Sequence, residues 1–304
     1  MKIGVIGLGS IAQKAYLPIY AKMQDQAEFI FSTRNEEVRD KVSQKYRFQN
    51  IVASFDELME YRLDACFIHA ATDSHYELAK RCLQNNIHVF IDKPVSESYK
   101  ETKELFELAE EKDLLFMVGF NRRFAPMVEK LKSLPEKRTI HLEKNEVDQA
   151  LSTQYGIYDM FIHLIDTAVY LLDDPILNVH SKVREQAGKM TYAQMQISTE
   201  QTECMLTMDL QSGAKTECYQ ITTPEKSLIL DQLTDLTVKI NDQTKTMRFG
   251  AWANTLEKRG FEQMVAAFLS SLKRRSKESL RQKDVLLSHK LCRGMLIDHV
   301  RSML

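Results

Sequence analysis

Residues 2–12 read KIGVIGLGSIA, an apolar run that enters a glycine turn. The short run without polar alternation predicts a buried β-strand at residues 2–6, and the amphipathic segment 11–23 predicts a helix directly after the turn. Between them, Gly7, Gly9 and Ala12 fit the pattern G-x-G-x-x-A. In this context Gly7 permits a tight turn, Gly9 lets a ligand approach the backbone, and Ala12 lets the helix pack closely on the strand.

This turn predicts a site for the pyrophosphate of a dinucleotide. Unpaired N–H groups and the dipole at the start of a helix favour a phosphate group there. We therefore expect the turn residues to bind the cofactor: Gly7, Gly9, Ser10, Ile11 and Ala12. On this pattern alone two alternatives stay open, an ordinary glycine turn of a flavodoxin-like fold and a methyltransferase.

The first part of the chain alternates strand-like and helix-like segments, a rhythm that indicates a parallel sheet. Short apolar runs predict strands at 2–6, 28–31, 64–69, 88–91 and 114–118. Amphipathic segments predict helices at 11–23, 36–46, 55–60, 74–84 and 98–112. Ser54, and either Ser96 or Ser98, are expected to cap the helices that follow them. The prediction is an α/β fold with an N-terminal Rossmann domain built on a doubly wound parallel sheet.

After Gly119 this alternation stops. Helices are predicted at 125–133, 158–172, 255–274 and 284–302, with a strand at 139–147. Residues 176–249 read as successive strands, and 205–210 with 215–222 form a predicted hairpin at Ser212-Gly213. The pattern predicts an α+β domain with a large, mostly antiparallel open sheet. We place an NAD(P)-binding domain at 1–118 and a substrate-binding and oligomerisation domain at 119–304.

Composition and charge exclude several classes of protein. Hydrophobic residues make up 44% and charged residues 27% of the 304 residues, as in soluble globular chains. The formal net charge of -1 gives no reason to expect nucleic acid or a membrane surface as partner, and no apolar run approaches a membrane span. The five cysteines contain no C-x-x-C pair, so we expect no metal site, no disulfide framework and a reducing, cytoplasmic location.

The end of the second predicted strand bears on the ribose of the cofactor. An acidic residue there would favour NAD, but the sequence reads Ser32, Thr33 and Arg34. Hydroxyls and a guanidinium suit a 2′-phosphate, because arginine offers a bidentate fork. We therefore favour NADP over NAD, and the missing acid also argues against a methyltransferase. The alternative for Arg34 is stacking on the adenine or plain solvation.

Two further clusters carry candidate chemistry. Lys93 stands in Asp92-Lys93-Pro94 directly after a predicted strand, where open α/β sheets bind ligands and where proline can favour a cis bond. Asp159 and His163 share one face of an otherwise apolar predicted helix. The functional interpretation is a general base, His163, assisted by Asp159. The structural alternatives are a solvated lysine and a buried histidine satisfied by a hydrogen bond.

Four motifs in order make the chain resemble the Gfo/Idh/MocA family, which includes glucose–fructose oxidoreductase and inositol dehydrogenase. They are the G-x-G-x-x-A turn, an E-K-P motif read here as Asp92-Lys93-Pro94, GFNRRFAP at 119–126, and D-x-x-x-H-x-x-D at 159–166. The resemblance spans nearly the whole chain. Residues 11–15, the D-K-P variant and WANTLEKRGF at 252–261 are similar to the MviM-like branch, whose label as virulence factors gives no chemistry.

The resemblance implies a dehydrogenase or reductase that uses NAD(P) on a CH–OH group of a sugar, polyol or sugar derivative. Hydride would move between that carbon and C4 of the nicotinamide, in a cleft between the domains. His163 would exchange the hydroxyl proton, Lys93 would stabilise the substrate oxygen, and Asp159 would position the substrate. The resemblance also implies a homodimer or homotetramer formed through the C-terminal sheet.

Further site residues follow from the same resemblance. Cofactor contacts are expected from the loops after the strands and from the GFNRRF stretch: Ala71, Thr72, His75, Asp92, Lys93, Asn121 and Arg122. His75 also suits a packing or capping role. Arg123, Tyr155 and Trp252 are candidates for the substrate, although Arg123 suits a structural ion pair equally well.

Two other functions stay open. A catalytically silent, dinucleotide-binding regulator or sensor on the same fold belongs to a different class, because fold does not settle function. The intact Lys93, Asp159 and His163 favour the enzyme. A relative that cleaves glycosides with a tightly held NAD is the third option.

Overall fold

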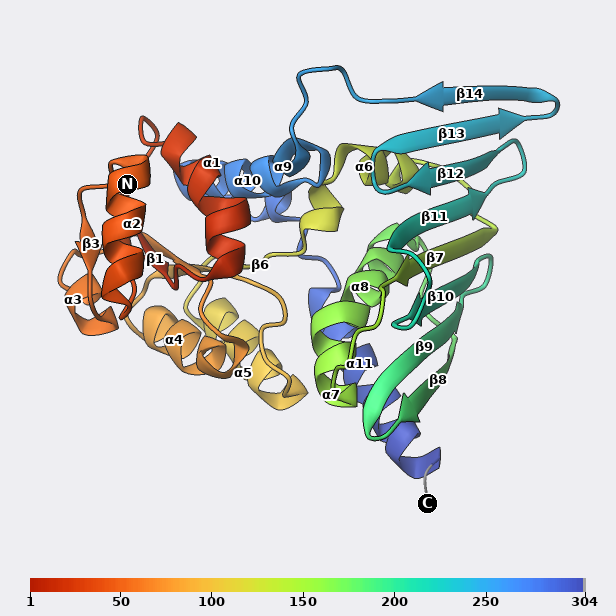
Figure 1. Ribbon diagram of the computed structural model, residues 1–304, viewed down its shortest axis with the longest axis horizontal. Helices are drawn as coiled ribbons and strands as arrows, with labels where there is room; N and C mark the ends of the chain where they lie inside the picture. Colours follow the sequence, from red (N-terminus) through yellow and green to blue (C-terminus); the bar gives the residue numbers. More distant parts are fainter. Residues whose placement is uncertain (303–304) are drawn as a thin grey trace. The chain divides into compact units, whose positions relative to one another are not determined.

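The computed structural model describes residues 1–302. The chain forms two compact units (Figure 1): the first contains Met1–Gly119 and Phe261–Gln282, and the second contains Phe120–Gly260 and Lys283–Leu304. The division near Gly119 lies where the alternation of strand-like and helix-like segments stops. It differs from the predicted domains in one segment, because Phe261–Gln282 belongs to the first unit. The assignment of cofactor and substrate roles to the two domains stays a prediction.

Among the described residues, the first unit contains a six-stranded parallel sheet in the order β3-β2-β1-β4-β5-β6. This is the strand order of the Rossmann fold, so the predicted doubly wound sheet is confirmed. The sequence did not reveal β3, because two half-buried residues give no apolar run. The strands are β1 (Lys2–Ile6), β2 (Glu28–Ser32), β3 (Ile51–Val52), β4 (Ala65–Ile68), β5 (His88–Ile91) and β6 (Phe116–Val118).

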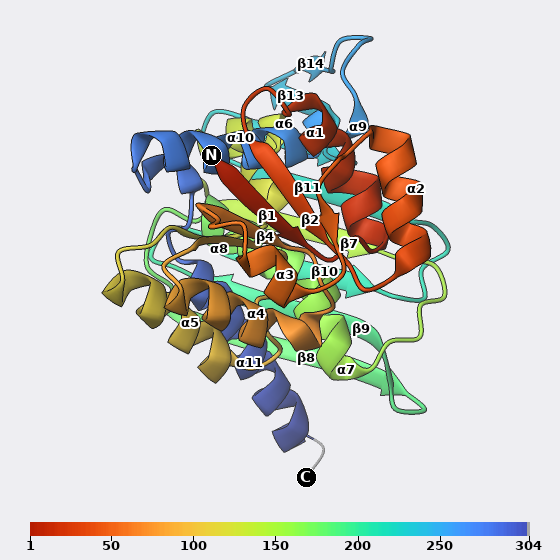
Figure 2. The same ribbon diagram turned by 90° about the vertical axis from the view of Figure 1, so that its left-hand side faces the viewer.

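Helices cover both faces of this sheet (Figures 1 and 2). On one face lie η1 (Ala12–Tyr16), a short π-helix, its continuation α1 (Leu17–Lys22), and α10 (Phe261–Arg274). Phe268 of α10 packs against Phe67 of β4 at a ring-centroid distance of 5.1 Å, which explains why this segment joins the first unit. The other helices are α2 (Glu36–Tyr46), α3 (Phe55–Met59), α4 (Thr72–Gln84), α5 (Tyr99–Glu111) and η4 (Glu278–Leu280).

Two of the predicted helix caps are confirmed in this unit. The Ser54 hydroxyl accepts a hydrogen bond from the Glu57 N–H at 3.2 Å, and the Ser98 hydroxyl accepts one from the Glu101 N–H at 3.4 Å. Such a side chain replaces a backbone acceptor that the first turn of a helix lacks. Ser98 is therefore the cap of α5, while the Ser96 hydroxyl, two residues earlier, accepts a hydrogen bond from the Ser98 N–H.

Among the described residues, the second unit contains an eight-stranded sheet in the order β14-β13-β12-β11-β7-β10-β9-β8. The neighbours β7 and β10 run parallel and the remaining pairs run antiparallel, so the predicted, mostly antiparallel sheet is confirmed. The strands are β7 (Thr139–Asn145), β8 (Asn178–Gln186), β9 (Lys189–Ser198), β10 (Glu203–Asp209), β11 (Thr216–Thr222), β12 (Ser227–Asp231), β13 (Asp235–Ile240) and β14 (Gln243–Met247).

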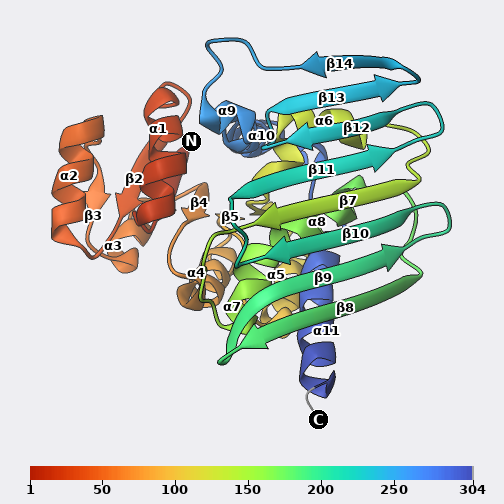
Figure 3. The ribbon, with the colours of Figure 1, turned by 45° about the vertical axis from the view of Figure 1, so that its right-hand side comes forward.

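Helices pack on one face of this sheet, and the described residues place none on the other (Figure 3). The covering helices are α8 (Ile162–Leu171) and α11 (Val285–Ser302), which also contact each other. α8 continues a π-helix, η3 (Gly156–Phe161), and the pair replaces the single predicted helix 158–172. The unit also contains η2 (Asn121–Phe124), α6 (Pro126–Lys132), α7 (Thr153–Tyr155) and α9 (Thr255–Lys258).

Two predicted elements were wrong. β10 and β11 do not form a hairpin, because β7 lies between them and pairs with both. The turn at Ser212-Gly213 carried a local hairpin signal, and a local signal cannot report a strand inserted from elsewhere in the chain. The predicted helix 255–274 is broken at Gly260, where φ is +81° and an added Cβ would lie 2.4 Å from the Ala125 nitrogen. Only glycine fits that backbone without strain.

Within residues 1–302, no helix has the length and apolar character needed to cross a membrane.

Candidate functional site

The glycine turn after β1 has the geometry that a dinucleotide requires. Gly7 has φ +88°, and a Cβ there would lie 2.5 Å from the Ala70 nitrogen. A Cβ on Gly9 would meet nothing within 4 Å, so the backbone at Gly9 is open to a ligand. Ala12 is buried, while Ser10 and Ile11 are exposed on the turn. These residues fit a pyrophosphate against the backbone N–H groups of the turn.

The loop after β2 holds more positive charge than the sequence pattern indicated. Ser32 is buried, Thr33 is half-buried and Arg34 is exposed. Arg39, on the first turns of α2, donates hydrogen bonds from Nη1 to the carbonyl oxygens of Thr33 at 2.9 Å and Arg34 at 3.1 Å. Arg39 therefore orders the loop and brings a second guanidinium to it, a role that only the fold reveals.

His75 connects two loops at the carboxyl ends of the strands. The ring is buried, with Nδ1 2.8 Å from the Pro94 carbonyl oxygen and Nε2 3.0 Å from the Ala70 carbonyl oxygen. Burial lowers the pKa of His75. Both ring nitrogens thus face backbone oxygens, which supports the packing role rather than a side-chain contact with the cofactor. Ala71 and Thr72, at the start of α4, lie exposed and half-buried beside this link.

Asp92 lies in a buried network behind the turn that carries Lys93. Its Oδ1 accepts from the Tyr16 hydroxyl at 2.5 Å, and its Oδ2 accepts from His69 Nδ1 at 2.8 Å. The Tyr20 hydroxyl lies 2.7 Å from His69 Nε2 and completes the chain. Burial opposes ionisation, but His69 and the hydrogen bonds outweigh it, so the pKa of Asp92 lies below its usual value.

This network changes the interpretation of Asp92. Both carboxylate oxygens accept hydrogen bonds within the first unit, so the side chain holds the turn, and its expected contact with the cofactor stays a prediction. Lys93, the next residue, is half-buried, and its bond to Pro94 is cis, as the sequence suggested. Sequence reasoning missed Tyr16, Tyr20 and His69, because only apolar patterning marks the segments in which they lie.

In the second unit, Arg122 and His163 meet. His163 lies in the first turn of α8 and is half-buried, as is Asp159 on η3. Arg122 Nη1 lies 2.6 Å from His163 Nδ1, and Arg122 Nε donates to Glu217 Oε1 at 2.6 Å and to the Tyr219 hydroxyl at 3.1 Å. Burial opposes the Glu217 charge, but Arg122 lowers the pKa of Glu217 to about 2.

The remaining residues of the GFNRRF stretch also have structural partners. Asn121 is buried and donates from Nδ2 to the Arg259 carbonyl oxygen at 2.8 Å. Arg123, with only 1% of its surface exposed, forms a bidentate pair with Asp166 at 2.9 and 2.8 Å. This pair supports the structural alternative for Arg123, and its contact with a substrate stays an untested prediction. Asn121 and Arg122 also form bonds within the second unit, and their expected cofactor contacts stay predictions.

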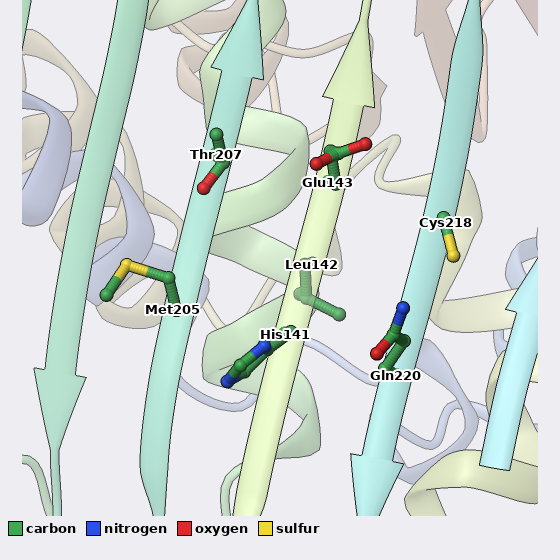
Figure 4. Close-up of a pocket in the computed structure, with 7 residues that line it drawn as sticks. All are labelled: His141, Leu142, Glu143, Met205, Thr207, Cys218 and Gln220. Atoms are coloured by element: carbon green, nitrogen blue, oxygen red, sulfur yellow. The ribbon is translucent and has the colours of Figure 1, made fainter.

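Two substrate candidates lie on the surface of the second unit. Trp252, in the segment between β14 and α9, is 99% exposed, and Tyr155 at the end of α7 is 42% exposed. A pocket on the helix-free face of the sheet contains none of the predicted site residues (Figure 4). Its lining residues are His141, Leu142, Glu143, Met205, Thr207, Cys218 and Gln220. The structure thus places the cofactor candidates up to Lys93 in the first unit, and Asn121, Arg122 and His163 in the second.

Comparisons with known proteins match each of the two units. Residues 1–120 match the family model described as oxidoreductase family, NAD-binding Rossmann fold, and residues 126–241 match the YceM-like C-terminal domain. The chain is 27% identical to YceM of Salmonella typhimurium over 99% of this chain and 98% of that protein. It is 31% identical to myo-inositol 2-dehydrogenase of Thermotoga maritima over 62% of this chain and 61% of that protein.

A solved structure extends the likeness to both units. The dehydrogenase MviM from Clostridium difficile is 29% identical, covers 98% of this chain and 99% of its own, and superposes with a TM-score of 0.91. The predicted MviM-like branch is therefore supported along the whole length of the chain. With the Rossmann sheet, the open glycine turn and the second, mostly antiparallel sheet, these likenesses assign residues 1–120 to the NAD-binding Rossmann fold of the Gfo/Idh/MocA oxidoreductases and make the whole chain similar to oxidoreductases of this kind.

Proposed function

We propose that this protein transfers a hydride between NAD(P) and a carbinol or carbonyl carbon of a sugar, polyol or sugar derivative. The open glycine turn carries the proposal, because Gly9 leaves its backbone accessible where the family binds the dinucleotide. The substrate class is supported by the name of one relative, the myo-inositol 2-dehydrogenase of Thermotoga maritima.

The chain supplies the groups that such a reaction needs. When bound, the nicotinamide accepts or donates the hydride. Lys93 and His163 are the side chains that hold the substrate oxygen and handle its proton, and Asp159 positions the substrate. The network of Tyr16, His69 and Asp92 keeps the turn that bears Lys93 in one conformation.

The first experiment separates an enzyme from a silent sensor. Wild type, Lys93→Ala and His163→Ala are mixed with NAD or NADP and a panel of polyols, sugars and sugar acids, and nicotinamide absorbance is followed. We expect turnover by wild type, a loss of about 10²- to 10⁴-fold in each variant, and cofactor binding that calorimetry still detects in both variants. Equal binding by all three proteins with turnover by none would favour the sensor. Cofactor that co-purifies and is never released would favour glycoside cleavage.

A further inference from the structure

The contact between Arg122 and His163 determines which nitrogen of His163 can carry a proton. We propose that Arg122 is a positioning residue that fixes His163 as the neutral Nε2–H tautomer, so that His163 donates a hydrogen bond to the substrate oxygen and does not accept its proton. The inference deepens the proposed function and rests on it for the identity of the substrate oxygen. It also reverses the general-base role that the family resemblance implied.

The chemistry of arginine decides the direction of this hydrogen bond. A guanidinium has five N–H donors and no acceptor, and it stays protonated in proteins. At 2.6 Å from Arg122 Nη1, His163 Nδ1 must therefore be the acceptor and carry no proton. A neutral imidazole whose Nδ1 accepts has its single proton on Nε2.

Other buried groups hold Arg122 in this position. Glu217 and Tyr219, both on β11, accept hydrogen bonds from Arg122 Nε at 2.6 and 3.1 Å. The side chains of Arg122 and Glu217 are only 5% and 4% exposed, and Arg259 Nη1 lies 3.6 Å from the other Glu217 oxygen. If Arg122 turned away, it would leave a buried carboxylate short of its partner, which is strongly unfavourable.

The imidazolium form of His163 is also disfavoured. A proton on Nδ1 would place an N–H against the N–H of Arg122, and a second positive charge would lie beside the guanidinium. To act as a general base through Nε2, His163 would need its proton on Nδ1. That Nδ1–H would again face the N–H of Arg122. Arg122 thus opposes both states that proton acceptance requires.

In the reduction direction the reacting groups then have separate tasks. A bound, reduced nicotinamide would supply the hydride, with its electron pair, to the carbonyl carbon. The carbonyl oxygen takes its proton from the Lys93 ammonium, which becomes the neutral amine and is reprotonated from solvent. His163 donates its Nε2–H to the same oxygen as negative charge develops, the role of a neutral imidazole acting as an electrophile. The reverse sequence describes oxidation.

Nitrogen-15 NMR of the imidazole rings tests the tautomer without any substrate. In protein labelled at histidine, the His163 signals are assigned by their loss in His163→Gln. We expect an unprotonated Nδ1 and a protonated Nε2 at neutral pH in wild type. We also expect Arg122→Met to shift His163 toward Nδ1–H or the cation. A wild-type signal from Nδ1–H or from imidazolium would overturn the proposal, and so would an Arg122→Met protein that keeps the wild-type tautomer. The wild-type spectrum remains decisive if the variant does not fold.

Kinetics test whether Nε2 of His163 acts as a hydrogen-bond donor or as a base. His163→Gln keeps an N–H donor but has no basic nitrogen, whereas the matched His163→Leu has neither. We expect His163→Gln to retain activity within about tenfold of wild type and His163→Leu to lose about 10²- to 10³-fold, the effect of removing one oxyanion donor. An equal loss in both variants would restore the general-base role. If wild type turns over no substrate, the proposed function fails, while the NMR result still stands or falls on its own.

Discussion

Arg34 and Arg39 place two guanidinium groups at the loop where a Rossmann domain meets the adenosine ribose. Arg34 is exposed after β2, and Arg39 holds the loop through the carbonyl oxygens of Thr33 and Arg34. No carboxylate stands at 32–34 to bind ribose hydroxyls. Charge-assisted hydrogen bonds from arginine favour a 2′-phosphate, so the residues of this loop support a preference for NADP.

Replacing Arg34 should therefore weaken NADP more than NAD. We expect Arg34→Ala to raise the dissociation constant for NADP by about 10- to 100-fold, the value of one hydrogen bond to a charged group, and to leave NAD nearly unchanged. Titration calorimetry with both cofactors measures the two constants. Lys41→Ala, which removes an exposed positive charge from the following helix α2, is the matched control. A wild type that prefers NAD, or an equal loss for both cofactors, would contradict the expectation.

At the scale of the element, α11 buries an ionisable ring in the interior of the second unit. His289 is fully buried, with Nδ1 3.2 Å from the Val285 carbonyl oxygen and its ring 5.9 Å from that of Phe120. Burial lowers the pKa of His289 to about 4 from an ordinary value of 6.5. The unfolded chain therefore takes up a proton between these two values while the folded chain does not. The contribution of the neutral, buried His289 to the free energy of unfolding is therefore complete above pH 6.5 and is lost as the pH falls toward 4.

His289→Gln should flatten this part of the pH dependence. The glutamine stays neutral, so we expect its free energy of unfolding to fall by about 1.4 kcal/mol less per pH unit than that of wild type in this range. Urea unfolding at a series of pH values measures both slopes. His75 also has a lowered pKa and contributes the same sign to both proteins, so it cancels in the difference. The exposed His141→Gln is the control, and parallel curves for wild type and His289→Gln would be the contrary result.

At the scale of the whole molecule, the helix-free face of the eight-stranded sheet is the surface through which we propose that copies pair. The side chains on this face include Met205, Cys218 and Ile229, which are half-buried rather than fully exposed. Family resemblance implies a homodimer or homotetramer through this sheet. The polar groups and sulfur atoms around its central pocket are accessible for such a contact (Figure 4).

Charge placed at the centre of this face should separate the copies. Gln220 lines the central pocket, and Gln220→Arg would put uncompensated charge into any contact made there. We expect light scattering at micromolar concentration to give a multiple of the chain mass for wild type and a smaller multiple for Gln220→Arg. Gln201→Arg, in the exposed turn between β9 and β10, should leave the mass unchanged. A monomeric wild type would remove the proposal.

Much of this fold is encoded locally. The apolar run at 2–6, the turn at Gly7 and Gly9, and the amphipathic segments after it specify a parallel sheet because burial and backbone freedom are properties of short stretches. The same holds for the alternating strands of the second half. The position of Lys93 after a strand and of His163 on an apolar helix made them candidates, and the family resemblance supplied their expected catalytic roles.

Partners distant in sequence were decided only by the tertiary structure. Arg122 meets Glu217 from β11, Asp92 meets Tyr16 from the first helix, and β7 inserts between β10 and β11. A residue pattern reports that a side chain will be buried or polar, but it carries no information about which distant group will satisfy it. Such pairings form only when the sheets and helices have packed. The chain's own sequence therefore determined its strands, its glycine turn and its candidate residues, whereas the packed fold determined what each charged side chain binds.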